Sequence, residues 1–247
     1  MTTLFSKFLE QHLYIVAQPI VDALSKEVYF YEILSRAKLD GKTYLPNDFL
    51  PDMNIHMRFR LAKHIFKRIC DLQDKYPDMS FSLNISSIEI DMGIEEFLNT
   101  IFESETYNLD TSRCVIEVTE HASIDNPKTY ESLKNIKSKF GFKFALDDFG
   151  SNFATLDKIY DDDGVFDYIK VDGKLVREID KDIVKQISLH HIIKIIQGCG
   201  KKAIVEYISS EDIYKTIMKI SQPDYLQGFY FGEPTDIESF AEKETAS

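Results

Sequence analysis

The chain has 247 residues, of which 44% are hydrophobic and 28% charged, and its formal net charge is −12. This composition is typical of a folded globular protein and excludes compositional disorder. The acidic balance, without Lys and Arg clustered among aromatic residues, argues against binding to polymeric nucleic acid. No stretch approaches the roughly 18 consecutive apolar residues of a membrane helix, and residues 1–11 lack the regions of a signal peptide. We therefore expect a cytoplasmic protein without membrane insertion.

The cysteines exclude two further classes of protein. Cys70, Cys114 and Cys199 are far apart, odd in number and without Cys-x-x-Cys spacing. This pattern favours neither a disulfide framework nor a thiolate zinc site. We expect all three to be buried as small hydrophobic side chains.

Short apolar or β-branched runs recur along the chain and predict eight strands. In chain order they are Tyr14–Ile20, Val28–Leu34, Ser80–Ile85, Cys114–Val118, Lys143–Leu146, Tyr168–Val171, Lys202–Val205 and, more weakly, Tyr225–Leu226. Helical spacing lies between most of them, clearest from Met57 to Leu72 and from Val184 to Ile196. Alternating strands and helices are typical of α/β architecture.

The first two predicted strands depart from this alternation. The link from Val21 to Glu27 is shorter than the dozen or more residues that a parallel crossover needs, so these strands should be antiparallel. No repeat or Pro- and Gly-rich linker divides the sequence. We therefore predict a TIM-type (β/α)8 barrel with an antiparallel first strand, forming a single domain over residues 1–247.

Acidic and amide side chains fall at the ends of these strands, together with one lysine. They are Glu32, Asn84, Glu117, Asp147, Asp148, Lys170, Glu206 and Gln227. In a barrel the carboxyl ends of the strands converge on one face, where catalytic residues lie. Carboxylate and amide oxygens are the ligands that Mg²⁺ or Mn²⁺ prefers. The adjacent carboxylates of Asp147 and Asp148 suit two ions about 3.5 to 4 Å apart, as in two-metal phosphoryl chemistry.

Other interpretations of these residues stay open at this point. A single acidic residue at a strand end commonly caps the next helix, and crowded carboxylates require either bound metal or extensive salt bridges. Two other candidates are weaker. Residues 161–164 form an Asp-Asp-Asp-Gly run that reads as a solvated turn, and neighbouring His190 and His191 cannot share one helix face.

Eight short motifs follow one another in a recognisable order. They are Gln18-Pro19-Ile20-Val21 with Glu32-Ile33-Leu34-Ser35-Arg36, Leu83-Asn84-Ile85-Ser86, Ile116-Glu117-Val118-Thr119-Glu120, Ala145-Leu146-Asp147-Asp148-Phe149-Gly150, Ile169-Lys170-Val171-Asp172, Val205-Glu206 and Gln227-Gly228-Phe229. In this order they resemble the EAL-domain family of cyclic di-GMP phosphodiesterases, from about Tyr14 to Pro234. The family implies hydrolysis of cyclic di-GMP to linear pGpG on a barrel with an antiparallel first strand.

The resemblance also implies a role for each site residue. One metal ion would be held by Glu32, Asn84, Glu117 and Asp147, and a second by Asp147, Asp148 and Glu206. Lys170 and Gln227, with Glu206, would position or activate the attacking water, and Glu120 would tie down the loop after the fifth strand, which in the family also contributes to a homodimer. The substrate contacts implied are Gln18, Leu34, Arg36 and Pro234, with Arg36 gripping a phosphate oxygen.

The sequence departs from the family pattern at several positions. Ile33 replaces the signature Ala, but strand alternation should point it away from the site. Ser151-Asn152-Phe153-Ala154-Thr155 replaces the usual Thr-Gly-Tyr-Ser-Ser, which bears on loop ordering and dimerisation. Gly173 replaces an Arg, and Glu206-Tyr207-Ile208-Ser209 replaces Glu-Gly-Val-Glu, so one carboxylate is lost and a bulky ring is gained.

Three functions are compatible with these observations. The first is a metal-dependent phosphodiesterase that uses Mg²⁺ or Mn²⁺, with two ions. The second is a catalytically weak member of the family that binds cyclic di-GMP or a protein partner as a receptor or adaptor. The third is an unrelated metal-dependent barrel acting on a carboxylate substrate, which explains the acidic residues but not the ordered motifs.

Overall fold

A closed barrel of eight strands forms the centre of the molecule. The computed structural model describes residues 12–103, 108–119, 126–150, 159–160 and 164–244. Its sheet has the order β1-β9-β8-β7-β6-β5-β4-β2-β3, and an additional β1–β2 pairing closes the barrel. The strands are β1 (Leu13–Asp22), β2 (Val28–Leu39), β3 (Lys42–Tyr44), β4 (Phe81–Ser86), β5 (Cys114–Thr119), β6 (Lys143–Phe149), β7 (Tyr168–Val171), β8 (Lys202–Val205) and β9 (Tyr225–Gln227). The predicted (β/α)8 barrel is confirmed.

The first strand, β1, is antiparallel to both of its neighbours. It pairs with β2 along one edge and with β9 along the other, whereas the other neighbours around the barrel are parallel. A tight turn joins β1 to β2, and in it the amide of Lys26 donates to the carbonyl of Asp22 at 2.9 Å. Such a turn leaves no room for a crossover helix, so the prediction of an antiparallel first strand is confirmed.

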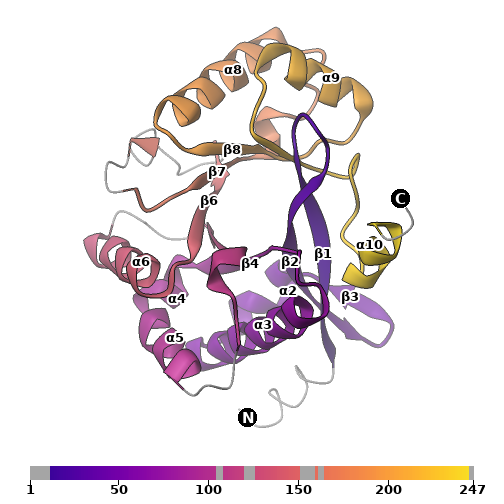
Figure 1. Ribbon diagram of the computed structural model, residues 1–247. Coiled ribbons are helices and arrows are strands. Elements are labelled where there is room, and N and C mark those ends of the chain that lie inside the picture. The colour runs from indigo at the N-terminus through magenta and orange to yellow at the C-terminus, as the bar shows by residue number, and fades with distance from the viewer. Residues whose placement is uncertain (1–11, 104–107, 120–125, 151–158, 161–163, 245–247) are drawn as a thin grey trace.

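Strand β2 is longer than the sequence analysis predicts. The sequence predicts an end near Leu34, but the strand continues to Leu39 and pairs there with β3. Only Tyr31 to Ile33 pair with β4, so the outer part of β2 leaves the barrel with β1 (Figure 1). The expectation that Glu32 ends its strand is therefore wrong, because pairing with β1 and β3 satisfies the backbone beyond the barrel.

Helices cover the outside of the barrel, with α8 and α9 on one side and α3 and α5 on the other (Figure 1). They are α2 (Pro46–Phe49), α3 (Ile55–Lys75), α4 (Ser87–Asp91), α5 (Ile94–Glu103), α6 (Pro127–Phe140), α8 (Ile183–Gly198), α9 (Glu211–Ile220) and α10 (Ile237–Glu244). The two clearest predicted helices correspond to α3 and α8. Side chains cap both at their first turns: Asn54 accepts from the amide of Met57, and Asp182 accepts from the amides of Val184 and Lys185.

Two hydrophobic clusters follow from strand alternation. The larger lies between strands and helices and includes the outward-facing Ile33, Ile116 and Ile169. The smaller consists of Ile20, Phe30, Val115, Ala145, Tyr168 and Ile204, with Tyr225 packed against it. Because successive side chains of a strand point to opposite faces, this second cluster fills the barrel interior, as layers of side chains do in such folds. Ile33 points away from the interior, as predicted.

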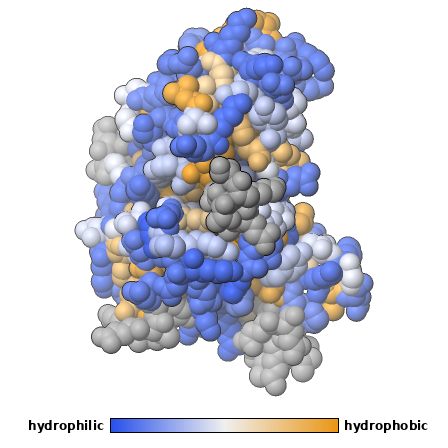
Figure 2. All heavy atoms as spheres, turned by 45° about the vertical axis from the view of Figure 1, so that its right-hand side comes forward, coloured by the Kyte–Doolittle hydropathy of each residue, from blue (hydrophilic) through white to orange (hydrophobic). Residues whose placement is uncertain are grey.

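Two predictions from composition have different outcomes. None of the helices in the described residues is long and apolar enough to cross a membrane. The cysteines divide: Cys70 and Cys114 are buried, but Cys199 is exposed, so the expectation for Cys199 is wrong. It follows the last turn of α8, where the chain turns at the surface toward β8. The face in Figure 2 is mostly hydrophilic, with hydrophobic side chains in small groups.

Candidate functional site

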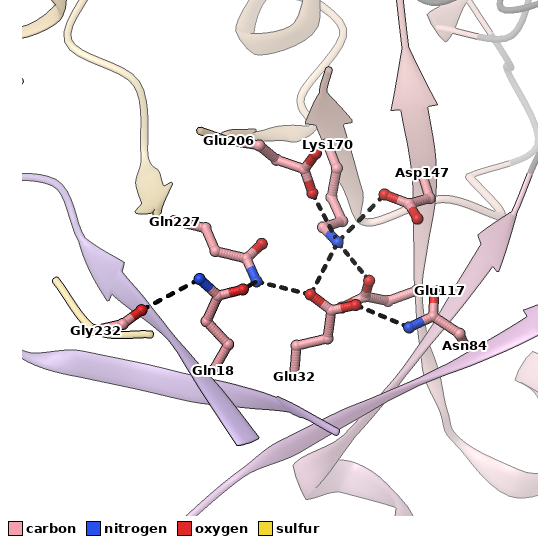
Figure 3. Close-up of polar contacts among 9 residues, drawn as sticks. All are labelled: Gln18, Glu32, Asn84, Glu117, Asp147, Lys170, Glu206, Gln227 and Gly232. Atoms are coloured by element: carbon pink, nitrogen blue, oxygen red, sulfur yellow. Dashed lines mark hydrogen bonds and ion pairs between the residues drawn. The ribbon is translucent and has the colours of Figure 1, made fainter. Parts of the chain in front are cut away.

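A layer of polar side chains lies inside the barrel directly above the smaller cluster, toward the carboxyl ends of the parallel strands. Each member stands two residues from an interior residue of the lower layer. The pairs are Phe30 and Glu32, Ser82 and Asn84, Val115 and Glu117, Ala145 and Asp147, Tyr168 and Lys170, Ile204 and Glu206, Tyr225 and Gln227, and, on the reversed β1, Ile20 and Gln18. The period of two in a strand thus gathers side chains from eight strands at one level (Figure 3).

Lys170 lies at the centre of this layer, surrounded by four carboxylates. Its Nζ is 2.6 Å from Glu117, 2.9 Å from Glu206, 3.2 Å from Asp147 and 3.4 Å from Glu32. The residue is 1% exposed, so the ammonium has little access to water. Four carboxylates and one ammonium leave a formal charge of −3 (Figure 3). Lys170 therefore compensates only part of the negative charge.

Glu32 is held by side chains from strands on either side of β2. Asn84 Nδ2 donates to one of its oxygens at 2.8 Å, and Gln227 Nε2 donates to the other at 2.7 Å. Gln227 Nε2 also lies 3.3 Å from Gln18 Oε1, and Gln18 donates in turn to the carbonyl of Gly232. This chain of hydrogen bonds fixes the orientation of the Glu32 carboxylate without adding charge.

The pKa values of the group reflect burial and mutual repulsion. Burial and the charge of Glu32 raise the pKa of Glu117 well above its usual range. Burial raises the pKa of Glu206 to about 8, and Asp147 and Glu32 add to the rise while Lys170 opposes it. Burial also opposes ionisation of Glu32, but attraction to Lys170 and the hydrogen bond from Gln227 outweigh it and lower that pKa. Full ionisation of the cluster therefore calls for more positive charge than Lys170 supplies.

Strand β6 brings two successive carboxylates to one side. In a regular strand Asp147 and Asp148 would face opposite ways, but the pairing with β7 shifts register between Leu146 and Phe149, and Asp148 has a φ of 58°. Asp tolerates this left-handed conformation better than most residues. As a result, oxygens of Asp147, Asp148 and Glu206 lie within 4.8 Å of one another.

The donor set fits a hard divalent cation. It offers carboxylate oxygens, which Mg²⁺ and Mn²⁺ prefer, and it carries uncompensated negative charge. Glu117 Oε1 is buried and makes no hydrogen bond with any described residue. The three clustered oxygens of Asp147, Asp148 and Glu206 match the second metal group implied by the family resemblance. Salt bridges to Lys170 compensate only part of the negative charge, so salt bridging alone does not balance the cluster.

A cavity of about 470 Å³ opens above the polar layer. Glu32, Asp148, Glu206 and Gln227 lie on its wall, together with the predicted substrate contacts Gln18 and Leu34. The rest of the described wall consists of Asp172, Gly173, Lys174, Arg177, Tyr207, Ser209, Gly228 and Phe229. This volume is within the range of about 300–1,000 Å³ that is typical of small-molecule sites.

The structure does not bring every predicted site residue to this cavity. Arg36 is half-buried farther along β2, where it donates to the carbonyl of Ser35. Pro234 precedes Thr235, which pairs with Ala17 on β1, and neither Arg36 nor Pro234 is among the described wall residues. Glu120, residues 151–155 of the altered loop and Asp161 to Asp163 lie outside the described residues. His190 and His191 each bind a different backbone carbonyl, of Ile220 and Ile187.

Sequence reasoning missed part of the cavity wall. Lys174 and Arg177 come from the turn after β7, which contains the short helix η3 (Gly173–Leu175). No strand end or helical period marks them in the sequence. Their only signal in the sequence is Gly173, a departure from the family pattern that lets the turn approach the segment after β8.

Comparisons with known proteins agree with this geometry. The model of the EAL domain family matches residues 2–234. The chain is 28% identical over 235 residues to the probable cyclic di-GMP phosphodiesterase PdeA of Escherichia coli K12, covering 90% of this chain and 30% of that protein. It is 27% identical over 246 residues to the cyclic di-GMP phosphodiesterase PdeB of Shewanella oneidensis, covering 95% and 28%.

Solved structures share the fold. An EAL domain protein from Listeria monocytogenes superposes with a TM-score of 0.82 at 21% identity, covering 100% of this chain and 98% of that one. Bacillus subtilis YkuI, solved with cyclic di-GMP and calcium, gives a TM-score of 0.78 at 20% identity, covering 99% and 65%. The chain spans less than a third of the length of the two curated relatives above. With the family model matching nearly every residue, the chain belongs to the EAL domain family.

Proposed function

We propose that this chain is a metal-dependent phosphodiesterase that hydrolyses cyclic di-GMP to linear pGpG. The observation that carries the proposal is the polar layer, in which four carboxylates surround one lysine beneath a cavity of small-molecule size. The names of the curated relatives and the nucleotide bound in the YkuI structure support the choice of substrate. Because the chain belongs to the EAL domain family, we discard the third candidate function, that of an unrelated metal-dependent barrel acting on a carboxylate substrate.

The proposed metal ligands are those of the family resemblance. Glu32, Asn84, Glu117 and Asp147 form one group, and Asp147 with Asp148 and Glu206 forms the other. When bound, Mg²⁺ or Mn²⁺ would lower the pKa of a water molecule and neutralise charge on the phosphoryl group. In the present geometry Asn84 donates to Glu32 through Nδ2, so its Oδ1 stays available as a ligand atom.

Side chains of the polar layer would orient the attacking water and stabilise negative charge. Glu206 is the most exposed of the four carboxylates around Lys170, with 21% of its side chain accessible, and is the one that a water in the cavity reaches first. Lys170 keeps its protons at Nζ, since the surrounding carboxylates raise its pKa well above the usual range despite burial. Gln227 orients Glu32 through Nε2. Glu206 and Gln227 are thus placed to orient the water, and Lys170 to stabilise negative charge.

Turnover of cyclic di-GMP with and without divalent metal tests the proposal. Purified protein should form pGpG with Mg²⁺ or Mn²⁺ and lose this activity in EDTA. Glu32→Ala should reduce turnover at least about 100-fold, since a ligand at the reacting centre is removed. Glu211→Gln, on the exposed start of α9, is the matched control and should keep wild-type activity.

The same experiment separates the second candidate. Its support is the pair of departures at Tyr207 and Ser209, both on the cavity wall. Binding of cyclic di-GMP without product would favour a receptor, and absence of both binding and product would contradict the proposal altogether. Ser209→Glu restores the family's carboxylate, and we expect it to raise turnover if its loss limits the reaction.

Assembly and location are also part of the proposal. The family resemblance implies a homodimer with cyclic di-GMP as its small-molecule partner. The expectations of a cytoplasmic protein and of one domain over residues 1–247 come from the sequence itself. Light scattering of the purified chain with and without substrate measures the first point. A monomer under both conditions would remove the dimer from the proposal without affecting the proposed reaction.

A further inference from the structure

Tyr207 occupies an unfavourable backbone conformation on the cavity wall, directly after Glu206. Its φ is 64°, in the left-handed region where glycine is favoured. A bulky residue there is strained, and such strain persists where the surrounding structure imposes it. The ring is nevertheless 44% exposed, so burial of the ring does not explain the conformation. The arrangement directs an aromatic side chain to the cavity at a cost in backbone energy.

The backbone on both sides of Tyr207 is held by hydrogen bonds. The amide of Glu206 donates to the carbonyl of Val171 at 3.2 Å, and the amide of Ile208 donates to the carbonyl of Gln227 at 3.0 Å. These bonds tie the segment to two neighbouring strands of the barrel. The position of the Tyr207 backbone, from which the ring projects, is therefore fixed relative to Glu206 and Gln227.

Gly173 on the adjacent turn makes room for this ring. A Cβ atom at position 173 would lie 2.6 Å from the Cβ of Tyr207 and 2.9 Å from its Cγ. Those atoms are near the backbone and cannot swing away as the end of a flexible side chain does. The two departures from the family pattern, Gly173 and Tyr207, are thus one paired change.

Arg177 completes the arrangement. Its guanidinium carbon lies 4.5 Å from the centroid of the Tyr207 ring, within cation–π range. Both residues are exposed and both line the cavity that Glu32 and Glu206 share. The guanidinium thus orients the ring at the rim of the cavity.

We propose that Tyr207, oriented by Arg177, is a stacking surface for one guanine base of the substrate. The argument rests on the proposed function, which puts the scissile phosphodiester at the carboxylates. A base attached to that phosphate through its ribose lies a few ångströms farther out, toward the rim where Tyr207 is fixed. Purine bases have large π faces, and aromatic side chains bind them by stacking. Tyr207 then contributes to the affinity for the nucleotide.

Binding of cyclic di-GMP to Tyr207 variants tests the proposal. Isothermal titration in Ca²⁺ measures affinity, and steady-state assays in Mg²⁺ or Mn²⁺ separate KM from kcat. Tyr207→Ala should weaken binding and raise KM about 10-fold, which is within the range for loss of one stacked base, while kcat changes by less than about 3-fold. Tyr207→Phe keeps the ring and should retain wild-type affinity.

Two further variants act as controls for the ring and for its neighbour. Tyr160→Ala removes another exposed tyrosine, which lies at the opposite end of the barrel beside Lys143 and Lys202, and it should leave affinity unchanged. Arg177→Ala should weaken binding by a smaller factor. In the Tyr207→Ala background it should have little further effect, because Arg177 acts through the ring.

Each outcome decides between the two proposals. If the wild type binds and hydrolyses the nucleotide and Tyr207→Ala does so equally well, the stacking surface is refuted and the proposed function stands. If binding without turnover is seen and Tyr207→Ala loses affinity, the stacking surface stands and the enzymatic function fails. If the wild type does not bind cyclic di-GMP at all, both fail.

Discussion

Lys170 shows how one residue stabilises the site that it belongs to. Its ammonium contacts four carboxylates and is almost completely buried. The individual polar residues could be predicted from the sequence, because each stands at a fixed offset from an apolar strand. Which of them pair could not be predicted, since the lysine and its partners are spread from position 32 to position 206 and only closure of the barrel sets their distances.

Replacing this lysine should destabilise the chain in the absence of metal. Lys170→Met leaves the carboxylates without their buried cation, and loss of one partner of a buried ion pair costs about 3–5 kcal/mol. The measurement is urea unfolding in EDTA. Lys202→Met breaks an ion pair with Asp224 in which the lysine is 56% exposed, and it should cost no more than about 1 kcal/mol. Equal losses in the two variants would contradict the central role of Lys170.

The contact between Gly173 and Tyr207 gives a second prediction. Gly173→Ala should destabilise the protein by about 1–3 kcal/mol through overpacking, because its Cβ would meet Tyr207 at 2.6 Å. Tyr207→Gly relieves the left-handed strain and should stabilise by about 1 kcal/mol. The double variant should recover most of the loss at position 173, as contacting residues are not additive. Thermal unfolding of all four proteins measures the coupling, and simple additivity would argue against the contact.

At the scale of elements, local rules explain most of what the sequence predicts. Alternation and helical spacing gave the eight barrel strands and the helices α3 and α8, since each buries one face or stripe. They did not give the length of β2, which depends on pairing with β1 and β3. The register shift in β6 was also hidden, because the left-handed conformation of Asp148 depends on its neighbours in the barrel.

The cap of α3 offers a test at this scale. Asn54 Oδ1 accepts a hydrogen bond from the amide of Met57 at 3.1 Å. Asn54→Ala should lower the free energy of unfolding by about 1 kcal/mol, whereas Asn54→Asp keeps an acceptor and should cost much less. Denaturant unfolding compares the two. Because α3 packs on the outside of the barrel, neither change should alter the proposed turnover of cyclic di-GMP under conditions where the protein is folded.

For the whole molecule, the balance of charge links metal binding to stability. The polar layer holds a formal charge of −3 inside the barrel, counting the four carboxylates and Lys170. A cation that binds only the folded chain adds stability by mass action, about 2.7 kcal/mol at 100 times its dissociation constant. For a chain of this length that corresponds to a rise in Tm of roughly 5–10 °C.

Thermal unfolding with Mn²⁺ and with EDTA measures this effect without an activity assay. The wild type should show the rise in Tm. The double variant Asp147→Asn, Glu206→Gln should lose most of it, since each of the two proposed metal-ligand groups then lacks at least one carboxylate. Glu211→Gln, which changes an exposed carboxylate on α9, should behave as wild type. An undiminished rise in the double variant would mean that the cation binds elsewhere.

The two interior layers of the barrel have different roles. The lower layer stabilises the fold, and the upper layer carries the polar side chains of the candidate site. The lower layer of Ile20, Phe30, Val115, Ala145, Tyr168 and Ile204 packs the interior, whatever side chain stands two residues away on the same strand at the upper level. The upper layer can therefore change, by evolution or in a combinatorial library, while the packed scaffold beneath it is kept, provided that its buried charges stay paired. Proteins that descend from such a barrel can exchange one chemistry for another, or lose catalysis and become receptors, while they keep the packed interior that stabilises the fold.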